Sequence, residues 1–264
     1  MLTEMFSREK IEYFSVLSYG DCRIIRADII AREKFVPKSV IIYLIPYYAG
    51  ETVNISKYAA ARDYHLYIRE LNNRLTDELK ALYPDNFFKG YGDSSPIDER
   101  MAALNGGLGI LGDNGLLINE KYGSYVFISE IITDVEPEIL GAVNPKAPEH
   151  CEGCGLCKKK CPTGHLENCS CECLSSITQK KGELTEGEIE IMKKCDTVWG
   201  CDVCQDVCPY NQNPVLTPIS FFKEDRIEEL TEELLQSMDK KTFSERAFSW
   251  RGIKTLERNL KNMQ

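Results

Sequence analysis

Two cysteine runs constrain the fold of this chain more than any other feature of its sequence. The first run spans Cys151 to Pro162 and reads C-x2-C-x2-C-x3-C-P, and the second spans Cys201 to Pro209 and reads C-x2-C-x3-C-P. Runs of this kind wind short loops whose thiolates hold cubane [4Fe–4S] clusters. The second run repeats the first without its opening cysteine, so the sequence predicts a domain that holds two [4Fe–4S] clusters.

The ligands of each cluster follow from a rule of two-cluster ferredoxins, in which the fourth cysteine of each run ligates the other cluster. The rule assigns one cluster to Cys151, Cys154, Cys157 and Cys208. It assigns the second cluster to Cys161, Cys201 and Cys204. The eighth ligand is missing because Val198 stands where the second run should begin. Spacing alone leaves four candidates for it: Cys169, Cys171, Cys173 and Cys195.

The alternatives for these cysteines are a zinc site and a disulfide framework. Zinc sites prefer paired C-x2-C knuckles with a long spacer, rather than four cysteines in one run before a proline. Twelve cysteines without an export signal indicate a reducing compartment, and therefore metal ligation rather than disulfides. No apolar run approaches the ~18 residues of a membrane span. We therefore expect a cytoplasmic protein that does not cross a membrane.

Length and charge set further limits. A chain of 264 residues, 43% of them hydrophobic, has room for one large or two modest domains. The net charge of −9 argues against indiscriminate binding of nucleic acid, which depends on phosphate neutralisation by Lys and Arg. Local basic patches remain, such as Lys158–Lys160, although a solvated surface is the better explanation of each patch alone.

The residues before the cysteine runs predict a mixed α+β domain. Residues 39–46 form a continuous apolar run that is typical of a buried strand, and 116–118 and 125–132 predict two more strands. Between them, apolar residues at three- and four-residue steps predict a long helix that Pro84 ends. After the cysteine domain, 226–238 predicts an amphipathic helix, followed by a basic helical tail.

Two loops in the first domain could carry chemistry. The acidic loop from Gly92 to Arg100 contains Asp93 and Asp98, and either could be a general acid or a helix N-cap; local sequence favours the cap. Gly107–Gly112 matches GxGxxG, but a helix-like segment precedes it and a strand follows, the reverse of a nucleotide-binding fingerprint. These glycines are expected to let the backbone approach a bulky ligand.

With these motifs in order, the chain resembles the epoxyqueuosine reductases, cobalamin- and iron–sulfur-dependent enzymes of tRNA modification that are related to the reductive dehalogenases. The resemblance covers about residues 36–264. Besides both cysteine runs, it rests on these segments: Arg62–His65, Asp93–Arg100, Gly107–Asn119, Gly123–Glu130 and Arg258–Asn259. The segment that begins at Cys173 resembles the one that carries the family's remaining cluster ligand. The resemblance therefore selects Cys173 and leaves Cys169, Cys171 and Cys195 as non-ligands.

The resemblance also implies a fold, a cofactor and a reaction. It implies a nitroreductase-like corrinoid-binding domain at 1–140, a two-cluster ferredoxin-like domain at 141–216 and a helical segment at 217–264. Base-off cobalamin would lie near these residues: Leu117, Ile128, Ile131 and Ser175. Low-potential electrons from a ferredoxin- or flavodoxin-type donor would reduce epoxyqueuosine in tRNA to queuosine, with Asp93 as the proton donor. Such a carboxyl must stay protonated, and burial beside an apolar macrocycle raises a pKa. A monomer is expected.

Two alternatives stay open. The chain departs from the family's usual GKN at Gly112-Asp113-Asn114, and its N-terminal part is short. A paralogous corrinoid reductase that acts on another substrate, such as an organohalide, is therefore one alternative. The other is a two-cluster electron carrier without catalysis, in which Asp93 and Cys22 are structural; a lone cysteine such as Cys22 is by default a buried thiol.

Overall fold

The computed structural model describes all residues from 1 to 264 and divides into two compact units. The sheet unit comprises Met1–Pro46 and His65–Glu152, and the cluster unit comprises Tyr47–Tyr64 and Gly153–Gln264. No helix has the length and apolar character needed to cross a membrane. The division into three domains that the resemblance implies, with boundaries at residues 140 and 216, stays a prediction.

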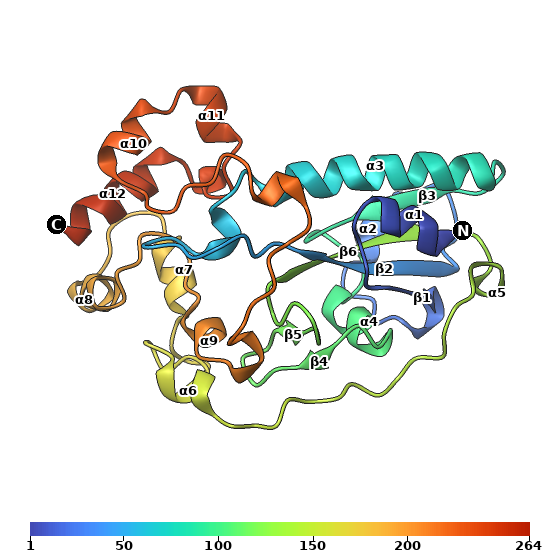
Figure 1. Cartoon of the computed structure of the whole chain (residues 1–264), viewed down its shortest axis with the longest axis horizontal. Helices are drawn as coiled ribbons and strands as arrows, with labels where there is room; N and C mark the ends of the chain where they lie inside the picture. The colour runs from blue at the N-terminus through green and yellow to red at the C-terminus, as the bar shows by residue number, and fades with distance from the viewer. The chain divides into compact units, whose positions relative to one another are not determined.

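The sheet unit is built on a four-stranded antiparallel sheet with the strand order β1-β2-β6-β3, visible in Figure 1. The strands are β1 (Phe14–Ser18), β2 (Ser39–Pro46), β6 (Val126–Thr133) and β3 (Phe88–Tyr91). Every residue of β2 is buried because helices cover both faces of this central strand. The strands predicted at 39–46 and 125–132 are confirmed, within one residue for the second.

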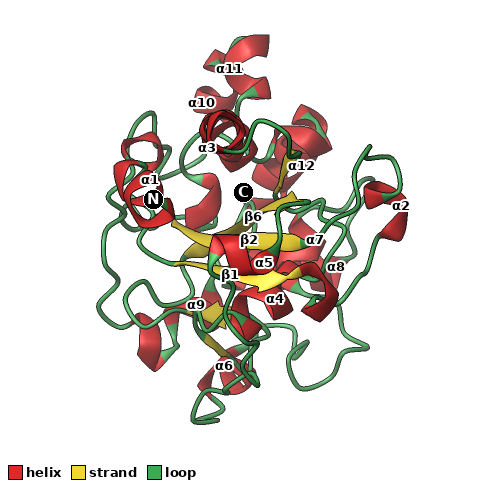
Figure 2. Ribbon diagram, turned by 90° about the vertical axis from the view of Figure 1, so that its right-hand side faces the viewer, coloured by secondary structure: helices red, strands yellow, loops and turns green.

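Helices lie on both faces of the sheet, as Figures 1 and 2 show. On one face lies α3 (Tyr64–Leu82), the predicted long helix, with buried Ile68, Leu71, Leu75 and Leu79. On the other face α4 (Glu99–Asn105) packs against β2 and β6, and Ala102 and Ala103 share an apolar cluster with Val40 and Ile42. Three short helices complete the unit: α1 (Leu2–Arg8), α2 (Ala27–Ile30) and α5 (Pro137–Leu140).

A two-stranded hairpin follows α4, formed by β4 (Ile110–Leu111) and β5 (Leu117–Ile118). A Cβ on Gly109 would lie 2.5 Å from the carbonyl oxygen of Ile118, and one on Gly112 would lie 2.5 Å from Oδ1 of Asn114. The close approach at these two glycines is therefore to the hairpin's own atoms. A helix precedes the GxGxxG segment and a strand follows it, which excludes the dinucleotide-binding arrangement.

The cluster unit consists of short helices and loops. In chain order the α-helices are α6 (Leu156–Lys160), α7 (Leu174–Thr178), α8 (Glu186–Lys194), α9 (Val203–Asp206), α10 (Glu232–Ser237), α11 (Lys240–Ser244) and α12 (Ile253–Met263). Single 3-10 turns occur in this unit at Lys57–Ala59, Pro209–Asn211, Ser220–Phe222 and Ser249–Arg251, and in the sheet unit at Tyr19–Asp21. The helix predicted at 226–238 is shorter than expected, because the chain turns helical only after Thr231, whose side chain caps α10.

The amide of Asn259 ties α12 to two loops of the cluster unit. This buried side chain donates hydrogen bonds to the carbonyl oxygens of Thr178 (2.7 Å) and Val198 (2.8 Å). Its neighbour Arg258 donates to the carbonyl oxygen of Lys180 at 2.7 Å. These bonds fix the segment after α7 and the segment before the second cysteine run. The Arg258–Asn259 pair of the sequence motif therefore has a structural role in this unit.

Candidate functional site

Asp93 lies in the loop between β3 and α4, in a backbone conformation that few residues adopt. Its φ is +61°, in the left-handed region that asparagine and aspartate tolerate better than most side chains. Its Oδ2 lies 3.2 Å from Nε2 of His65, at the start of α3. Both side chains are about half exposed, at 51% and 50%. The loop therefore presents a hydrogen-bonded carboxyl to the solvent.

The other aspartate of the loop is the helix cap. The Asp98 carboxylate accepts a hydrogen bond from the backbone N–H of Met101 at 3.1 Å, and it precedes the first residue of α4. The preference for a cap is thus confirmed for Asp98. Asp93 lies outside the helix and does not cap it.

Two more carboxyls lie behind the loop. Glu130, on β6, has no exposed surface, and the adjacent Glu99 is the first residue of α4. Burial, followed by the charges of Glu130 and Asp93, raises the pKa of Glu99 to about 8. Burial also raises the pKa of Glu130 to about 7, although the Ser95 hydroxyl opposes this and the charge of Asp93 adds to it. Both shifts favour the protonated form of these side chains relative to ordinary glutamates.

A groove of about 650 Å³ runs beside Asp93 between α3 and β3. Its lining includes His65, Arg69, Asn73 and Lys89, and it reaches Gly92 and Ser94, the two neighbours of Asp93. Two cations and several amide or hydroxyl groups make this groove polar. It suits an extended anionic ligand better than an apolar one.

The cysteine runs fold as a pair of short helices. Helix α6 carries Cys157, α9 carries Cys204, and the two helices pack against each other. Gly153 and Gly155, between the first three cysteines of the first run, have positive φ values of 67° and 71°, which lets the loop wind tightly. All twelve cysteines are free thiols in this structure. No group of three or more His, Cys, Asp or Glu side chains is arranged to hold a single metal ion.

Cys173 lies close to the second run. It is the residue that precedes α7, and its charge contributes to the raised pKa of both Cys201 and Cys204, after burial. Cys195 also acts on Cys201, but more weakly than Cys173 does. The assignment of Cys173 as the eighth ligand stays a prediction. Cys151 lies in the sheet unit, where its Sγ accepts the backbone N–H of Asp113 at 3.4 Å.

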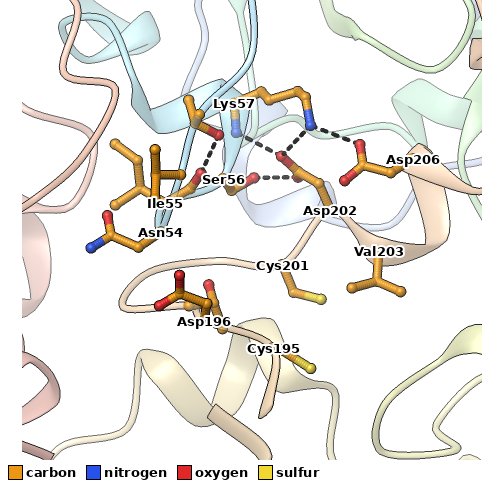
Figure 3. Close-up of a pocket in the computed structure, with 13 residues that line it drawn as sticks. Asn54, Ile55, Ser56, Lys57, Cys195, Asp196, Cys201, Asp202, Val203 and Asp206 are labelled. Atoms are coloured by element: carbon orange, nitrogen blue, oxygen red, sulfur yellow. Dashed lines mark hydrogen bonds and ion pairs between the residues drawn. The ribbon is translucent and has the colours of Figure 1, made fainter. Parts of the chain in front are cut away.

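A buried ion network supports the loop of the second run (Figure 3). Asp202, between two cluster cysteines, accepts hydrogen bonds from the Ser56 hydroxyl and from the backbone N–H of Lys57 at 2.7 Å. The Nζ of Lys57 lies 2.7 Å from Asp206 and 3.9 Å from Asp202. Burial raises the pKa of Asp202, and its bonds to Ser56 and Lys57 oppose the rise. The network borders a small cavity that Cys195 and Cys201 also line.

The residues predicted to lie near a corrinoid differ in their surroundings. Leu117 and Ile128 belong to the same apolar cluster beneath α4. Side chains alternate along a strand, so Ile131 faces the opposite side of the sheet, and it is fully buried. Only the backbone of Ile131 could share a ligand with Ile128. In the cluster unit, the hydroxyl of Ser175 accepts a hydrogen bond from Gln179 at 3.1 Å.

Sequence reasoning overlooked Glu130, Lys57 and Asp202 as site residues. The signal for Glu130 was present, since a glutamate in the middle of an apolar strand is unusual. Lys57 and Asp202 gave no such signal because nothing local links two residues so far apart in the chain. Cys22 is buried as expected, and burial raises the pKa of its thiol to about 12.

Two family models match the chain. The model described as "4Fe-4S double cluster binding domain" matches residues 150–211, which confirms an iron–sulfur domain of the predicted kind. The model described as "Epoxyqueuosine reductase QueG, DUF1730" matches residues 33–94, up to the acidic loop.

The chain is also similar to individual proteins. An epoxyqueuosine reductase of Leadbetterella byssophila is 30% identical over 239 residues, which cover 84% of this chain and 76% of that protein. A solved epoxyqueuosine reductase with a tRNA-Tyr epoxyqueuosine-modified stem loop has a TM-score of 0.79 at 22% identity, over 99% of this chain and 80% of that one. A Bacillus subtilis epoxyqueuosine reductase, with its aspartate catalytic loop swung out of the active site, has a TM-score of 0.78 at 23% identity, over the same shares.

The two structures establish the fold, a mixed helix and sheet architecture with an iron–sulfur domain. The Leadbetterella relative establishes the kinship, because its identity and coverage extend across both units of the chain. The chain is an oxidoreductase that belongs to the epoxyqueuosine reductase family.

Proposed function

We propose that this chain reduces epoxyqueuosine to queuosine in tRNA, with Asp93 as the proton donor. The observation that carries the proposal is the contact between Asp93 and His65 beside a cationic groove, in a chain with a double-cluster domain. Electrons and a proton donor are the two requirements for removing an epoxide oxygen, and this chain offers residues for both.

The proposal includes two [4Fe–4S] clusters. Their ligands are Cys151, Cys154, Cys157, Cys161, Cys173, Cys201, Cys204 and Cys208. The donor set supports this assignment, because seven free thiols in the two C-x2-C runs, together with Cys173 outside them, are the chemistry of cubane clusters.

The proposal also includes a base-off cobalamin and a nitroreductase-like sheet unit. Leu117, Ile128, the backbone near Ile131, and Ser175 would hold the corrinoid. The apolar surroundings of Leu117 and Ile128 fit a macrocycle. When bound, the corrinoid supplies a low-potential centre that can engage the substrate carbon.

The chain's own residues orient the substrate and move the proton. Asp93 lies between Gly92 and Ser94, which line the groove, and from there it would give its proton to the departing oxygen. His65 holds the carboxyl by its Nε2 contact and thereby selects one rotamer. In a Bacillus subtilis relative, an aspartate loop is the catalytic loop, which agrees with this role for the loop around Asp93.

A tRNA substrate suits the groove despite the acidic net charge. Arg69 and Lys89 supply positive charge beside Asp93, where a phosphate next to the modified nucleotide would lie. One relative is known with a modified tRNA stem loop. Further parts of the proposal are a ferredoxin- or flavodoxin-type electron donor, a monomeric enzyme and a cytoplasmic location, where tRNA is found.

The test is turnover by the anaerobically reconstituted chain, loaded with cobalamin, on an epoxyqueuosine-containing tRNA-Tyr stem loop. We expect queuosine as the product. Asp93→Asn should lose activity by about 10²-fold or more with an unchanged melting temperature. Asp98→Asn is the matched control, because asparagine caps a helix as well as aspartate does.

The alternatives predict different results. The chain could bind cobalamin and dehalogenate an organohalide, yet leave the stem loop unchanged. That result would assign the chain a different substrate with the same cofactors. Failure to bind cobalamin, with two reducible clusters present, would make the chain an electron carrier. Equal activity of the Asp93→Asn and Asp98→Asn variants would remove Asp93 from the mechanism.

A further inference from the structure

The buried carboxyl pair formed by Glu99 and Glu130 lies directly behind the loop that carries Asp93. Glu130 is paired with Ile42 on one neighbouring strand and with Tyr91 on the other. Its side chain points to the face covered by α4, the helix that begins with Glu99. The two carboxyls thus meet where α4 and the loop cover the sheet.

The pair has almost no hydrogen-bond donors. Neither carboxyl oxygen of Glu130, nor Oε2 of Glu99, has a partner in good hydrogen-bond geometry, and the Ser95 hydroxyl is the one nearby side-chain group that opposes the raised pKa of Glu130. The backbone N–H of Asp93 donates a hydrogen bond to Glu99, which links the pair to the loop. A buried carboxylate without donors is very unfavourable, whereas a neutral acid is tolerated.

The groups that surround the pair do not compensate a negative charge. The titratable side chains that interact with one or the other carboxyl are all acidic or neutral: Cys22, Tyr43, Tyr91, Asp93 and Asp98. The flanking cations are engaged elsewhere, since Arg23 lies 3.6 Å from Asp98 and Arg100 binds the carbonyl oxygen of Gly115. Protonation is therefore the available way to relieve the charge.

The proposed reaction consumes protons of the kind that this carboxyl pair can hold. Converting an epoxide into an alkene and water consumes two electrons and two protons, and a single aspartic acid carries only one proton. Asp93 must therefore be protonated again within each turnover. Glu99 is the acid in contact with the backbone of Asp93, and Glu130 adjoins it.

We propose that Glu99 and Glu130 store the second proton of the reaction and deliver it to Asp93 through Glu99. This inference rests on the proposed function. The O–H bond of Asp93 breaks as the first O–H bond forms on the departing oxygen. The O–H bond of Glu99 then breaks as Asp93 regains its proton, and Asp93 gives that proton to complete a water molecule. The pair keeps one added negative charge until solvent returns the proton, and the low-potential donor supplies both electrons through the clusters.

The stored proton can be measured without substrate, by infrared difference spectroscopy of the reconstituted chain between pH 5 and pH 9. We expect the carbonyl band of a protonated carboxylic acid to persist at pH 7 and to disappear above the raised pKa values of the pair. Glu99→Gln and Glu130→Gln should each remove intensity from this band, whereas Glu138→Gln, at an exposed position, should not. A wild-type spectrum without the band at pH 7 would overturn the inference, and this measurement requires no variant to fold.

Turnover measurements then test whether Glu99 delivers its proton to Asp93. Glu99→Gln should lower kcat about 10²-fold with little change in KM, and Glu99→Asp should restore part of the rate and shift the pH profile. Wild-type rates and pH profiles in both glutamine variants would overturn the relay. If the wild-type chain binds no tRNA and reduces no epoxyqueuosine while the infrared band titrates as expected, the proposed function fails and proton storage stands. The two failures are therefore distinguishable.

Discussion

The imidazole of His65 and the carboxyl of Asp93 are 3.2 Å apart, between Nε2 and Oδ2. The contact joins the first turn of α3 to the loop that follows β3. Because both side chains are half exposed, solvent screens their attraction, and the contact adds little to stability. The contact instead orients the carboxyl of Asp93, whose backbone is left-handed and whose two chain neighbours line the groove.

Replacement of His65 should therefore affect the reaction and not the fold. We expect His65→Ala to lower kcat about tenfold at an unchanged melting temperature, because Asp93 loses the group that orients it. His65→Gln keeps a side-chain donor and should recover part of the rate. Steady-state kinetics and thermal melting of both variants test this. A lower melting temperature together with wild-type kcat would assign His65 a structural role instead.

The groove makes a separate prediction about substrate binding. Replacing both Arg69 and Lys89 by serine should weaken stem-loop binding and reduce the slope of log K against log salt concentration by roughly 1–2. The control replaces Arg32 and Lys34 by serine, which removes the same charge from exposed positions outside the groove. Titrations at several salt concentrations measure both slopes. Equal slopes for the two double variants would place tRNA binding elsewhere.

The features predicted best from the sequence are those determined by interactions between residues close together in the chain. The ligand spacing of the cysteine runs lies within short loops, and the strand at 39–46 and the helix ended by Pro84 follow from hydrophobic pattern alone. The sequence pattern missed β3, which is short and contains Gly90. A Cβ at Gly90 would lie 2.3 Å from the Asn72 side chain, so this glycine allows α3 to pack closely on the strand.

The site was less predictable because its chemistry depends on tertiary contacts. Asp93 could be told from Asp98 only once the start of α4 was fixed by its cap. The protonation of Glu130 depends on burial by strands on both sides and by α4, and no window of sequence contains all of these elements. The Lys57–Asp202 network likewise joins residues that are distant in the chain.

The identity of the eighth cluster ligand can be tested by iron analysis. Cys173→Ser should remove one cluster and lower the iron content from about eight to about four atoms per chain, since serine rarely replaces a cluster thiolate. Cys171→Ser is the matched control from the same loop and should keep both clusters. Cys195→Ser should also keep both, because the family resemblance assigns the eighth ligand to the segment that begins at Cys173. Loss of a cluster in Cys195→Ser alone would move the ligand assignment there.

The ion network around Asp202 should stabilise the second cysteine loop. Asp202→Ala removes the acceptor for Ser56 and for the backbone of Lys57, and should lower the free energy of unfolding by on the order of 2–3 kcal/mol. Asp206→Ala is the control, because this half-exposed partner of Lys57 should contribute less than about 1 kcal/mol. Chemical denaturation of the reconstituted variants gives both values. A larger loss for Asp206→Ala would mean that the exposed partner dominates the network.

The raised pKa of Glu130 predicts a particular dependence of stability on pH. In the unfolded chain this carboxyl titrates near its usual 4.5, and in the folded chain near 7, so the folded state binds more protons between these values. Stability from this group is therefore greatest below pH 4.5 and is lost as the pH rises through about 7.

Glutamine mimics the protonated acid and cannot ionise, so Glu130→Gln should remove this dependence. The variant should resemble the wild type at pH 5.5 and exceed it at pH 9 by on the order of 2–3 kcal/mol. Calorimetric melting at the two pH values gives the difference, and Glu138→Gln should show none because its side chain is exposed. A pH-independent difference, or a variant less stable than the wild type at pH 9, would mean that Glu130 is ionised in the folded protein and has a donor that the strands and α4 do not supply.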